Sequence, residues 1–249
     1  MVNFPYRLSE PAGRRATLGL IVLKTDETIE EDFRHVFRPP DTALYVTRIP
    51  SGADVTPETL LSMREALPAA ASLLPDAAEF DVIGYCCTSG ATLIGPETVT
   101  ALVSANARTP QVTDPLTAAL AAFRAVGASS VSVVSPYVAS VADRIKEAFE
   151  QNGLRVPATL SFGEEAEDRV ARIDPASIHA AALETASRAP CDAVFLSCTN
   201  LRTFSIIDDL EDRLGLPVLS SNQVLAWHMS CSAGGAPLHD APGQLFRQT

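Results

Sequence analysis

The chain has 249 residues with a formal net charge of −11, and 47% of its residues are hydrophobic. This length allows one large domain or two smaller ones with a substantial core. The acidic balance argues against nucleic acid and membrane surfaces as partners, because both attract clustered lysine and arginine. The sequence contains no window of the roughly 18 apolar residues that a membrane span needs, and residues 1–15 lack a signal peptide's apolar core. We therefore expect a cytoplasmic protein.

Short apolar runs alternate with helical patterns along the chain. Residues 17–23 form a continuous apolar run, typical of a parallel strand covered on both faces. Strands are also predicted at residues 43–49, 80–85, 130–134, 155–160, 193–196 and 217–219. Helices are predicted at residues 29–37, 57–74, 96–107, 116–126, 138–150, 175–188, 204–214 and 222–229. This alternation implies an α/β fold built from parallel β-α-β units with right-handed crossovers.

Two of the predicted strands end in the same way, with a thiol followed by small polar residues. Residues 82–90 end in Cys87-Thr88-Ser89-Gly90, and residues 193–200 end in Cys198-Thr199-Asn200. Cys198 lies 111 positions after Cys87, and the same offset carries the first strand onto the strand at residues 131–134. It also carries Asp26 onto Tyr137, so that each follows the first strand of its half. We infer two similar α/β halves of about a hundred residues each.

The halves predict a domain division and a site. We place residues 16–113 plus 222–249 in the first domain, with an irregular arm at 1–15, and residues 114–221 in the second. In open parallel sheets, ligands bind beyond the carboxyl ends of the strands. Two halves that face each other across those ends form an interdomain cleft. We expect four side chains to line this cleft: Asp26, Cys87, Tyr137 and Cys198.

The paired thiols suggest acid–base or nucleophilic chemistry. A strand-to-helix turn supplies backbone N–H groups that can lower a thiol pKa, and both Cys87 and Cys198 have that placement. The same N–H groups, with Ser89 and Asn200, can hold a carboxylate or the enolate formed when an α-proton leaves. One thiol could remove a proton while the other delivers one, or one could add covalently to a double bond. Neither route needs a cofactor.

Simpler interpretations remain open for several residues. The chain has five cysteines, none with metal-site spacing, and a buried cysteine often behaves as a small hydrophobe. We interpret Cys86, Cys191 and Cys231 in this way, and Cys86 should point opposite to Cys87. Tyr137 could be a packed aromatic and Asp26 an ordinary helix-start carboxylate. The acidic residues at 164–168 could form a solvated loop, and residues 221–223 a capping segment.

The motifs together resemble the aspartate/glutamate racemase superfamily, most closely its branch of maleate cis-trans isomerase and arylmalonate decarboxylase. They lie at residues 19–22, 87–90, 136–137, 172–175, 197–200 and 219–223. The resemblance implies two flavodoxin-like domains related by a pseudo-twofold axis, an interdomain active site, cofactor-independent chemistry and a homodimer. It implies catalytic roles for Cys87 and Cys198 and substrate contacts from Asp26, Thr88, Ser89, Tyr137, Glu167, Thr199 and Asn200. The decarboxylases keep only the second thiol, so the chain looks more like an isomerase or racemase.

Two departures from that pattern bear on the substrate. Asp26 stands where maleate isomerases carry an asparagine, and a second family asparagine falls near Glu167 or Asp168. Carboxylates at these places would repel maleate and attract a cation. The turn at residues 23–28 also resembles the racemase-like proteins of ectoine-utilisation operons. We therefore expect a small, carboxylate-bearing zwitterion of ectoine or hydroxyectoine catabolism. The alternatives are maleate isomerisation, a decarboxylase-like lyase and a non-catalytic small-molecule binder.

Overall fold

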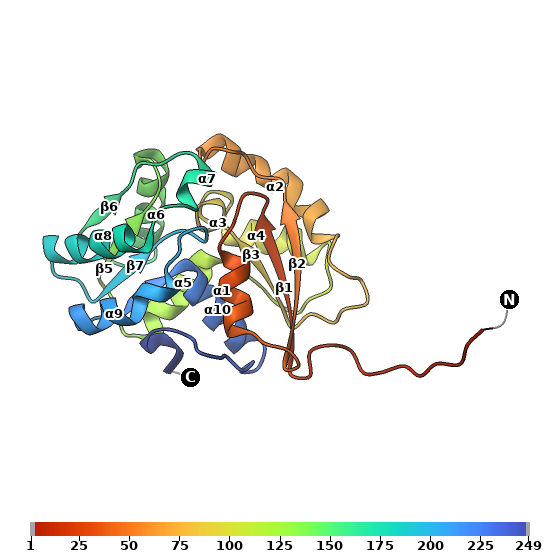
Figure 1. Ribbon diagram of the computed structural model, residues 1–249. Coiled ribbons are helices and arrows are strands. Elements are labelled where there is room, and N and C mark those ends of the chain that lie inside the picture. The colour runs from red at the N-terminus through yellow and green to blue at the C-terminus, as the bar shows by residue number, and fades with distance from the viewer. Residues whose placement is uncertain (1–2, 248–249) are drawn as a thin grey trace.

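The computed structural model describes residues 3–247 and contains two four-stranded parallel sheets (Figure 1). The first sheet has the order β2-β1-β3-β4, with β1 at Ala16–Leu23, β2 at Thr42–Ile49, β3 at Val82–Cys86 and β4 at Val112–Thr113. The second has the order β6-β5-β7-β8, with β5 at Val131–Ser135, β6 at Thr159–Ser161, β7 at Ala193–Leu196 and β8 at Val218–Ser220. The two orders are equivalent, which confirms the α/β fold of two similar halves.

Helices connect the strands as the alternating pattern predicts. They are α1 at Ile29–Val36, α2 at Pro57–Ala71, α3 at Thr88–Ile94, α4 at Pro96–Ser104, α5 at Pro115–Ala125, α6 at Ala139–Gln151, α7 at Glu167–Val170, α8 at Pro175–Arg188, α9 at Phe204–Leu214 and α10 at Ser221–Ser232. A 3₁₀ helix follows at Gln244–Arg247. Local capping explains several starts. Asp114, for example, accepts backbone N–H bonds from Leu116 at 2.9 Å and Thr117 at 3.0 Å, ahead of proline at the first helical position.

Several elements differ from the sequence predictions, and one of them is the seven-residue helix α3, which lies outside the predicted helices. The segment at 109–115, predicted only as a domain crossing, contributes the two-residue strand β4. Strand β6 is shorter than the predicted 155–160, because Pro157 has no N–H to give to the ladder. The acidic loop ends in the short helix α7, which begins at Glu167. Each difference concerns a segment too short to carry its own hydrophobic period.

The core of the second half fixes the end of β7. The rings of Phe123, Phe149 and Phe195 form a mutual edge-to-face cluster, with centroids 5.3–5.5 Å apart. Such pairs contribute about 0.5–1.5 kcal/mol each beyond their buried area. All four residues of β7 are buried, so the strand leads directly from this core to Cys198.

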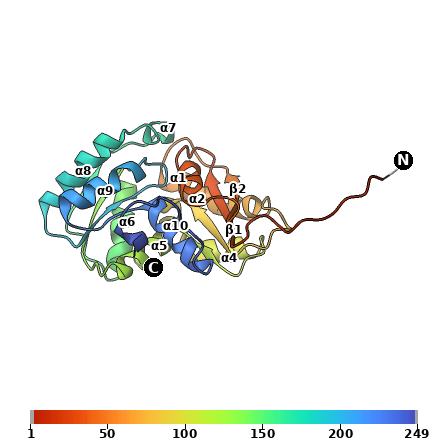
Figure 2. The ribbon, with the colours of Figure 1, turned by 60° about the horizontal axis from the view of Figure 1, so that its bottom comes forward.

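Helix α10 lies between the two halves. It packs against α5 (Figure 2), and it also contacts β3 of the first sheet and β8 of the second. The domain boundaries at 113 and 222 therefore stay a prediction. The described part of the N-terminal arm runs away from the first sheet without regular structure, with Phe4, Tyr6 and Leu8 exposed (Figure 1). Among residues 3–247, no helix is long and apolar enough to cross a membrane.

Candidate active site

The ends of β1, β3 and β7 meet around a small closed cavity. It measures about 10 Å³, close to the least space that holds one water molecule. Its lining residues are Leu23, Asp26, Cys87, Thr88, Ser89, Tyr137, Glu167, Cys198, Thr199 and Asn200. The structure thus brings all nine candidate site residues together and adds Leu23, the last residue of β1. The catalytic and binding roles assigned to these residues stay predictions.

Strand geometry separates the two adjacent cysteines. Cys86 is the last residue of β3 and lies outside the cavity lining, with its Sγ 3.4 Å from the carbonyl oxygen of Gly84. Cys87 follows as the N-cap of α3, where its Sγ accepts the N–H of Gly90 at 3.2 Å. The Ser89 hydroxyl lies 3.6 Å from the same sulfur. These contacts match the predicted division between a packing cysteine and a cavity cysteine.

The second thiol is presented by a strained turn. Cys198 has φ of 154°, outside the usual range for a residue with a side chain. Its Sγ accepts the backbone N–H of Asn200 at 3.4 Å. The side chain of Tyr137 is buried and lines the same cavity. Both halves of the repeat thus contribute one thiol, and each sulfur accepts an N–H from the turn that follows it.

The predicted lowering of the thiol pKa values is wrong for this closed site. Burial raises the pKa of Cys87 to about 12, and the hydrogen bonds from Ser89 and Gly90 oppose this rise without overcoming it. Burial, followed by the charge of Glu167, raises the pKa of Cys198 well above its usual value. The nearby Tyr137 hydroxyl and the Asn200 N–H act in the opposite direction. Burial in the closed site therefore favours the neutral form of both thiols.

Asp26 both starts a helix and faces the cavity. Its Oδ1 accepts the N–H groups of Thr28 at 2.8 Å and Ile29 at 2.9 Å, at the beginning of α1. Its Oδ2 is buried and has no hydrogen-bond partner among the described residues. Burial raises the pKa of this carboxyl from 3.8 to about 6. Oδ1 thus stabilises the start of α1, and Oδ2 is available to a ligand that donates a hydrogen bond.

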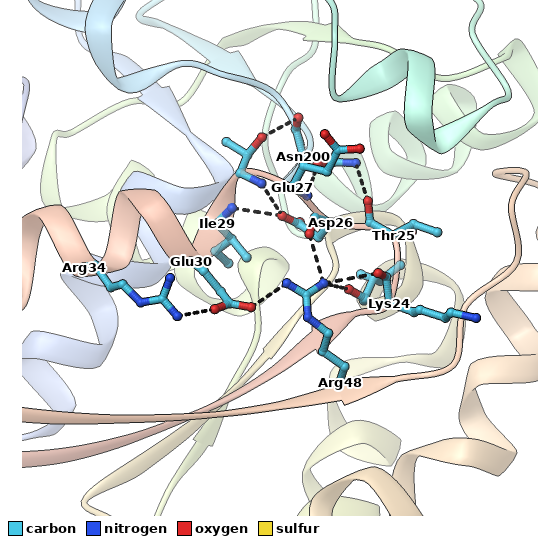
Figure 3. A network of polar contacts seen from close by, with 11 residues as sticks. Lys24, Thr25, Asp26, Glu27, Ile29, Glu30, Arg34, Arg48 and Asn200 are labelled. Atoms are coloured by element: carbon cyan, nitrogen blue, oxygen red, sulfur yellow. Dashed lines mark hydrogen bonds and ion pairs between the residues drawn. The ribbon is translucent and has the colours of Figure 1, made fainter.

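Arg48 supports the turn that carries Asp26. Its guanidinium donates to the carbonyl oxygens of Leu23 at 2.9 Å, Lys24 at 3.2 Å and Asp26 at 3.0 Å, and pairs with the Glu30 carboxylate (Figure 3). These donors bind backbone carbonyls of the turn, and the Asp26 carboxylate accepts none of them. Arg48 could not be found from the sequence, because the backbone carbonyls that it binds lie more than twenty residues before it along the chain.

Glu167 is the acidic residue that enters the site. Its carboxylate accepts the side-chain amide of Asn200 at 3.1 Å, whereas the side chain of Asp168 is 73% exposed. Burial raises the pKa of Glu167 to about 7, and the negative charge of Asp26 adds to the rise. No lysine, arginine or histidine is among the described residues that line the cavity. The interpretation of 164–168 as a solvated loop therefore fails at Glu167.

Two of the predicted binding hydroxyls are occupied by the protein itself. The Thr88 hydroxyl donates to Ser221 at 2.8 Å, and the Thr199 hydroxyl donates to the carbonyl oxygen of Cys86 at 3.3 Å. The Ser89 hydroxyl lies 3.6 Å from the Cys87 sulfur, and the Tyr137 hydroxyl lies near the Cys198 sulfur. Within the described part of the chain, no group of three His, Cys, Asp or Glu side chains is arranged to hold a metal ion.

The arylmalonate decarboxylase family model matches residues 53–246. The chain belongs to the arylmalonate decarboxylase family. It is 30% identical to arylmalonate decarboxylase from Bordetella bronchiseptica over 135 residues, which are 53% of this chain and 56% of that relative. The chain thus spans little more than half of the length of this relative. It is 25% identical to maleate isomerase from Geobacillus stearothermophilus over 218 residues, 82% of this chain and 86% of the relative.

Solved structures of both enzymes are similar to this chain. A double mutant of arylmalonate decarboxylase in its liganded form superposes with a TM-score of 0.84 at 26% identity, covering 94% of this chain and all 100% of the other. A cysteine-to-serine mutant of Nocardia farcinica maleate cis-trans isomerase, with a covalently bound succinylcysteine intermediate, gives 0.84 at 22% identity and covers 94% and 99%. The family and the two-domain fold place the chain among the racemase-like enzymes of the maleate isomerase and arylmalonate decarboxylase branch.

Proposed function

We propose that this protein is a cofactor-independent isomerase or racemase that uses Cys87 and Cys198 on a small carboxylic acid. The observation that carries the proposal is the shared cavity, which one cysteine from each half lines. With the substrate bound, one cysteine would be a thiolate that has released its proton to solvent, and its sulfur would take the proton from the substrate's α-carbon and leave an enolate. The S–H of the other cysteine would then protonate the opposite face of that carbon, so the net proton count of the enzyme is unchanged.

The charge of the cavity supports a substrate that also carries a cation. Two carboxyl groups, Asp26 and Glu167, face the space, and the described lining residues include no cationic side chain to balance them. A second substrate carboxylate would be repelled there, whereas an amidinium or ammonium group would pair with the free Oδ2 of Asp26. The cation would also favour a thiolate, because a nearby positive charge lowers the pKa of a thiol. Ser89 and Tyr137 can donate hydrogen bonds to the substrate carboxylate.

Ectoine and hydroxyectoine fit this charge pattern, since each joins a carboxylate to a cationic amidine ring. We therefore place the substrate among the intermediates of ectoine-type compatible-solute catabolism. Maleate isomerisation is the second candidate, favoured by the similarity to maleate isomerase over 82% of this chain. The retained Cys87 argues against a decarboxylase-type lyase. A cytoplasmic homodimer remains part of the proposal.

The test is α-hydrogen exchange in D₂O, followed by proton NMR. The purified protein is incubated with ectoine, hydroxyectoine, maleate and phenylmalonate, and decarboxylation and cis-trans isomerisation are recorded in parallel. We expect exchange or epimerisation of an amidine acid and little reaction with the dicarboxylates. If the protein converts maleate and reacts with no amidine acid, maleate becomes the substrate in place of the proposed zwitterion. Binding without any reaction would support the non-catalytic alternative.

A further inference from the structure

Ser221 links the two thiol-bearing turns through a single oxygen atom. It is the first residue of α10 and is fully buried. Its Oγ accepts the hydroxyl of Thr88 at 2.8 Å and the backbone N–H of Cys198 at 3.0 Å. Thr88 directly follows Cys87 and opens α3. The two donors therefore belong to different halves of the repeat, and each is within one residue of a cavity thiol.

The turn at Cys198 depends on such an outside contact. A φ of 154° is costly for a residue with a side chain and persists only where the surroundings enforce it. The N–H of Cys198 would have no acceptor if the Ser221 oxygen were removed, and a buried unpaired N–H is itself unfavourable. The hydrogen bond from the Cys198 N–H to Ser221 thus helps to fix the backbone conformation that orients the Cys198 side chain.

The beginning of α10 is itself firmly held, so it can serve as a fixed reference. Ser220 and Gln223 form a reciprocal capping box, and the Gln223 side chain also donates to the carbonyl oxygen of Pro242 at 2.8 Å. The neighbouring Asn222 donates to the carbonyl oxygen of Thr199 at 2.8 Å. Ser221 is therefore presented by a rigid element that belongs to neither thiol turn.

We propose that Ser221 is a positioning residue that sets the placement of Cys87 and Cys198 relative to each other. The inference rests on the proposed two-thiol function. Ser221 is absent from the cavity lining, so it acts through Thr88 and the Cys198 backbone and does not touch the substrate. In the sequence, Ser221 belongs to one motif of the family resemblance and to a possible capping segment at 221–223, and in the structure the N-cap residue is Ser220.

Three variants test this role. Ser221→Ala removes the shared acceptor, and Ser221→Thr keeps an oxygen at the same place. Thr88→Val removes only the hydroxyl donor that follows Cys87. It provides a second test of the same link if Ser221→Ala does not fold. The matched control is Ser230→Ala on the same helix, a buried serine whose hydroxyl donates to the carbonyl oxygen of Ala236 at 2.6 Å, away from the thiols.

The first readout needs no substrate. Iodoacetamide alkylation of Cys87 and Cys198 is measured by peptide mass mapping across a range of pH, with exposed Cys231 as the internal reference. We expect Ser221→Ala and Thr88→Val to change the Cys87-to-Cys198 rate ratio by threefold or more. Ser221→Thr and Ser230→Ala should retain the wild-type ratio. An unchanged ratio in both Ser221→Ala and Thr88→Val, or an equal change in Ser230→Ala, would overturn the inference even if the enzyme turns over.

The second readout uses the α-exchange reaction. We expect Ser221→Ala to lower kcat by tenfold or more with KM within threefold of wild type, and Ser221→Thr to recover most of the loss. An equal fall in kcat for Ser230→Ala would show a general structural effect and contradict the positioning role. If wild type exchanges no substrate, the proposed function fails, while the alkylation ratios still decide whether Ser221 positions the thiols.

Discussion

Asn200 donates its side-chain amide to the Glu167 carboxylate across 3.1 Å. The oxygen of the same amide accepts the backbone N–H of Glu27 at 2.8 Å, which fixes the end of the group that faces Glu167. An asparagine from the second half, itself tied to the first half, thus holds a carboxylate in the cavity beside Asp26. This arrangement favours recognition of a cation in a site that also holds two thiols.

Neutralising either carboxyl should change the choice of substrate. Asp26→Asn can keep its N–H acceptor at the start of α1, and Glu167→Gln keeps the size of the side chain. We expect each variant to bind amidine acids roughly tenfold more weakly, about 1.4 kcal/mol, and to bind dicarboxylates better. Titration calorimetry measures the affinity of each variant for hydroxyectoine and for maleate. Asp168→Asn, at the exposed neighbouring carboxylate, is the control, and weaker dicarboxylate binding by Asp26→Asn would refute the charge argument.

The ligand-free protein should lose stability as pH rises from about 5 to 8. Asp32 lies on α1, where its carboxylate accepts the side-chain amide of Asn222 at 2.7 Å. Burial raises the folded-state pKa of Asp26 to about 6 and those of Asp32 and Glu167 to about 7, above their values of 3.8 to 4.5 in an unfolded chain. The folded state therefore binds more protons in this window, and stability present below pH 4 is lost as pH rises through 6 to 7. We expect Tm to fall by roughly 5 °C, with a smaller fall in Asp32→Asn. A Tm that rises from pH 5 to pH 8 would contradict this.

Gly90 should be intolerant of a methyl group. A Cβ there would lie 2.6 Å from the Tyr85 hydroxyl and 2.9 Å from the Cys87 sulfur. Alanine favours a helix by about 1 kcal/mol over glycine, yet Gly90→Ala should lower kcat tenfold or more by displacing the thiol. Steady-state kinetics measures the loss. In the control Gly84→Ala, the nearest atom is the flexible sulfur of Met229, so activity per folded molecule should be retained. Full activity of Gly90→Ala would disprove the assigned thiol position.

Substrate admission should require separation of residues 53–55 from 165–167. The N–H of Val55 donates to the Glu165 carbonyl oxygen at 2.8 Å, and that of Glu167 to the carbonyl oxygen of Ala53 at 3.0 Å. The side chain of Glu167 lines the cavity, which measures only about 10 Å³. Asp54 and Ala166 form the antiparallel bridge between them. Such a pair has Cα atoms about 4.5 Å apart, within reach of a disulfide.

The double variant Asp54→Cys/Ala166→Cys should therefore lock the site. We expect its oxidised form to lose turnover and dithiothreitol to restore it, as followed by the α-exchange assay. Asp54→Cys alone, oxidised in parallel, controls for damage to the native thiols. A fully crosslinked enzyme that keeps wild-type turnover would show that substrate enters by another route.

The sequence predicts the residues that line the cavity well, because the internal repeat gives two strands the same ending. The offset of 111 positions selects Cys87 and Cys198, and carries Asp26 onto Tyr137. Parallel strands then bring their carboxyl ends together, which requires no knowledge of side-chain packing. Strand alternation then predicts that Cys86 points away from Cys87 and is a packing residue.

Properties that depend on closure could not be predicted in this way. The pKa values of the thiols follow from complete burial, which arises only when loops distant in sequence seal the cavity. The bridging role of Ser221 needs the position of Thr88, 133 residues away. Arg48 likewise supports a turn about twenty residues before it, through backbone carbonyls that carry no sequence signature. Local patterns contain no information on such pairs.

Both thiols should take part in the same proton transfer, and α-deuterium exchange in single cysteine variants tests this most directly. Cys87→Ser and Cys198→Ser are each compared with wild type in D₂O, on whichever amidine acid exchanges. Loss of a catalytic acid or base typically costs about 10²- to 10⁴-fold, so we expect racemisation to fall by at least that lower factor in each variant. Exchange that persists at the wild-type rate in both variants would contradict the two-thiol mechanism.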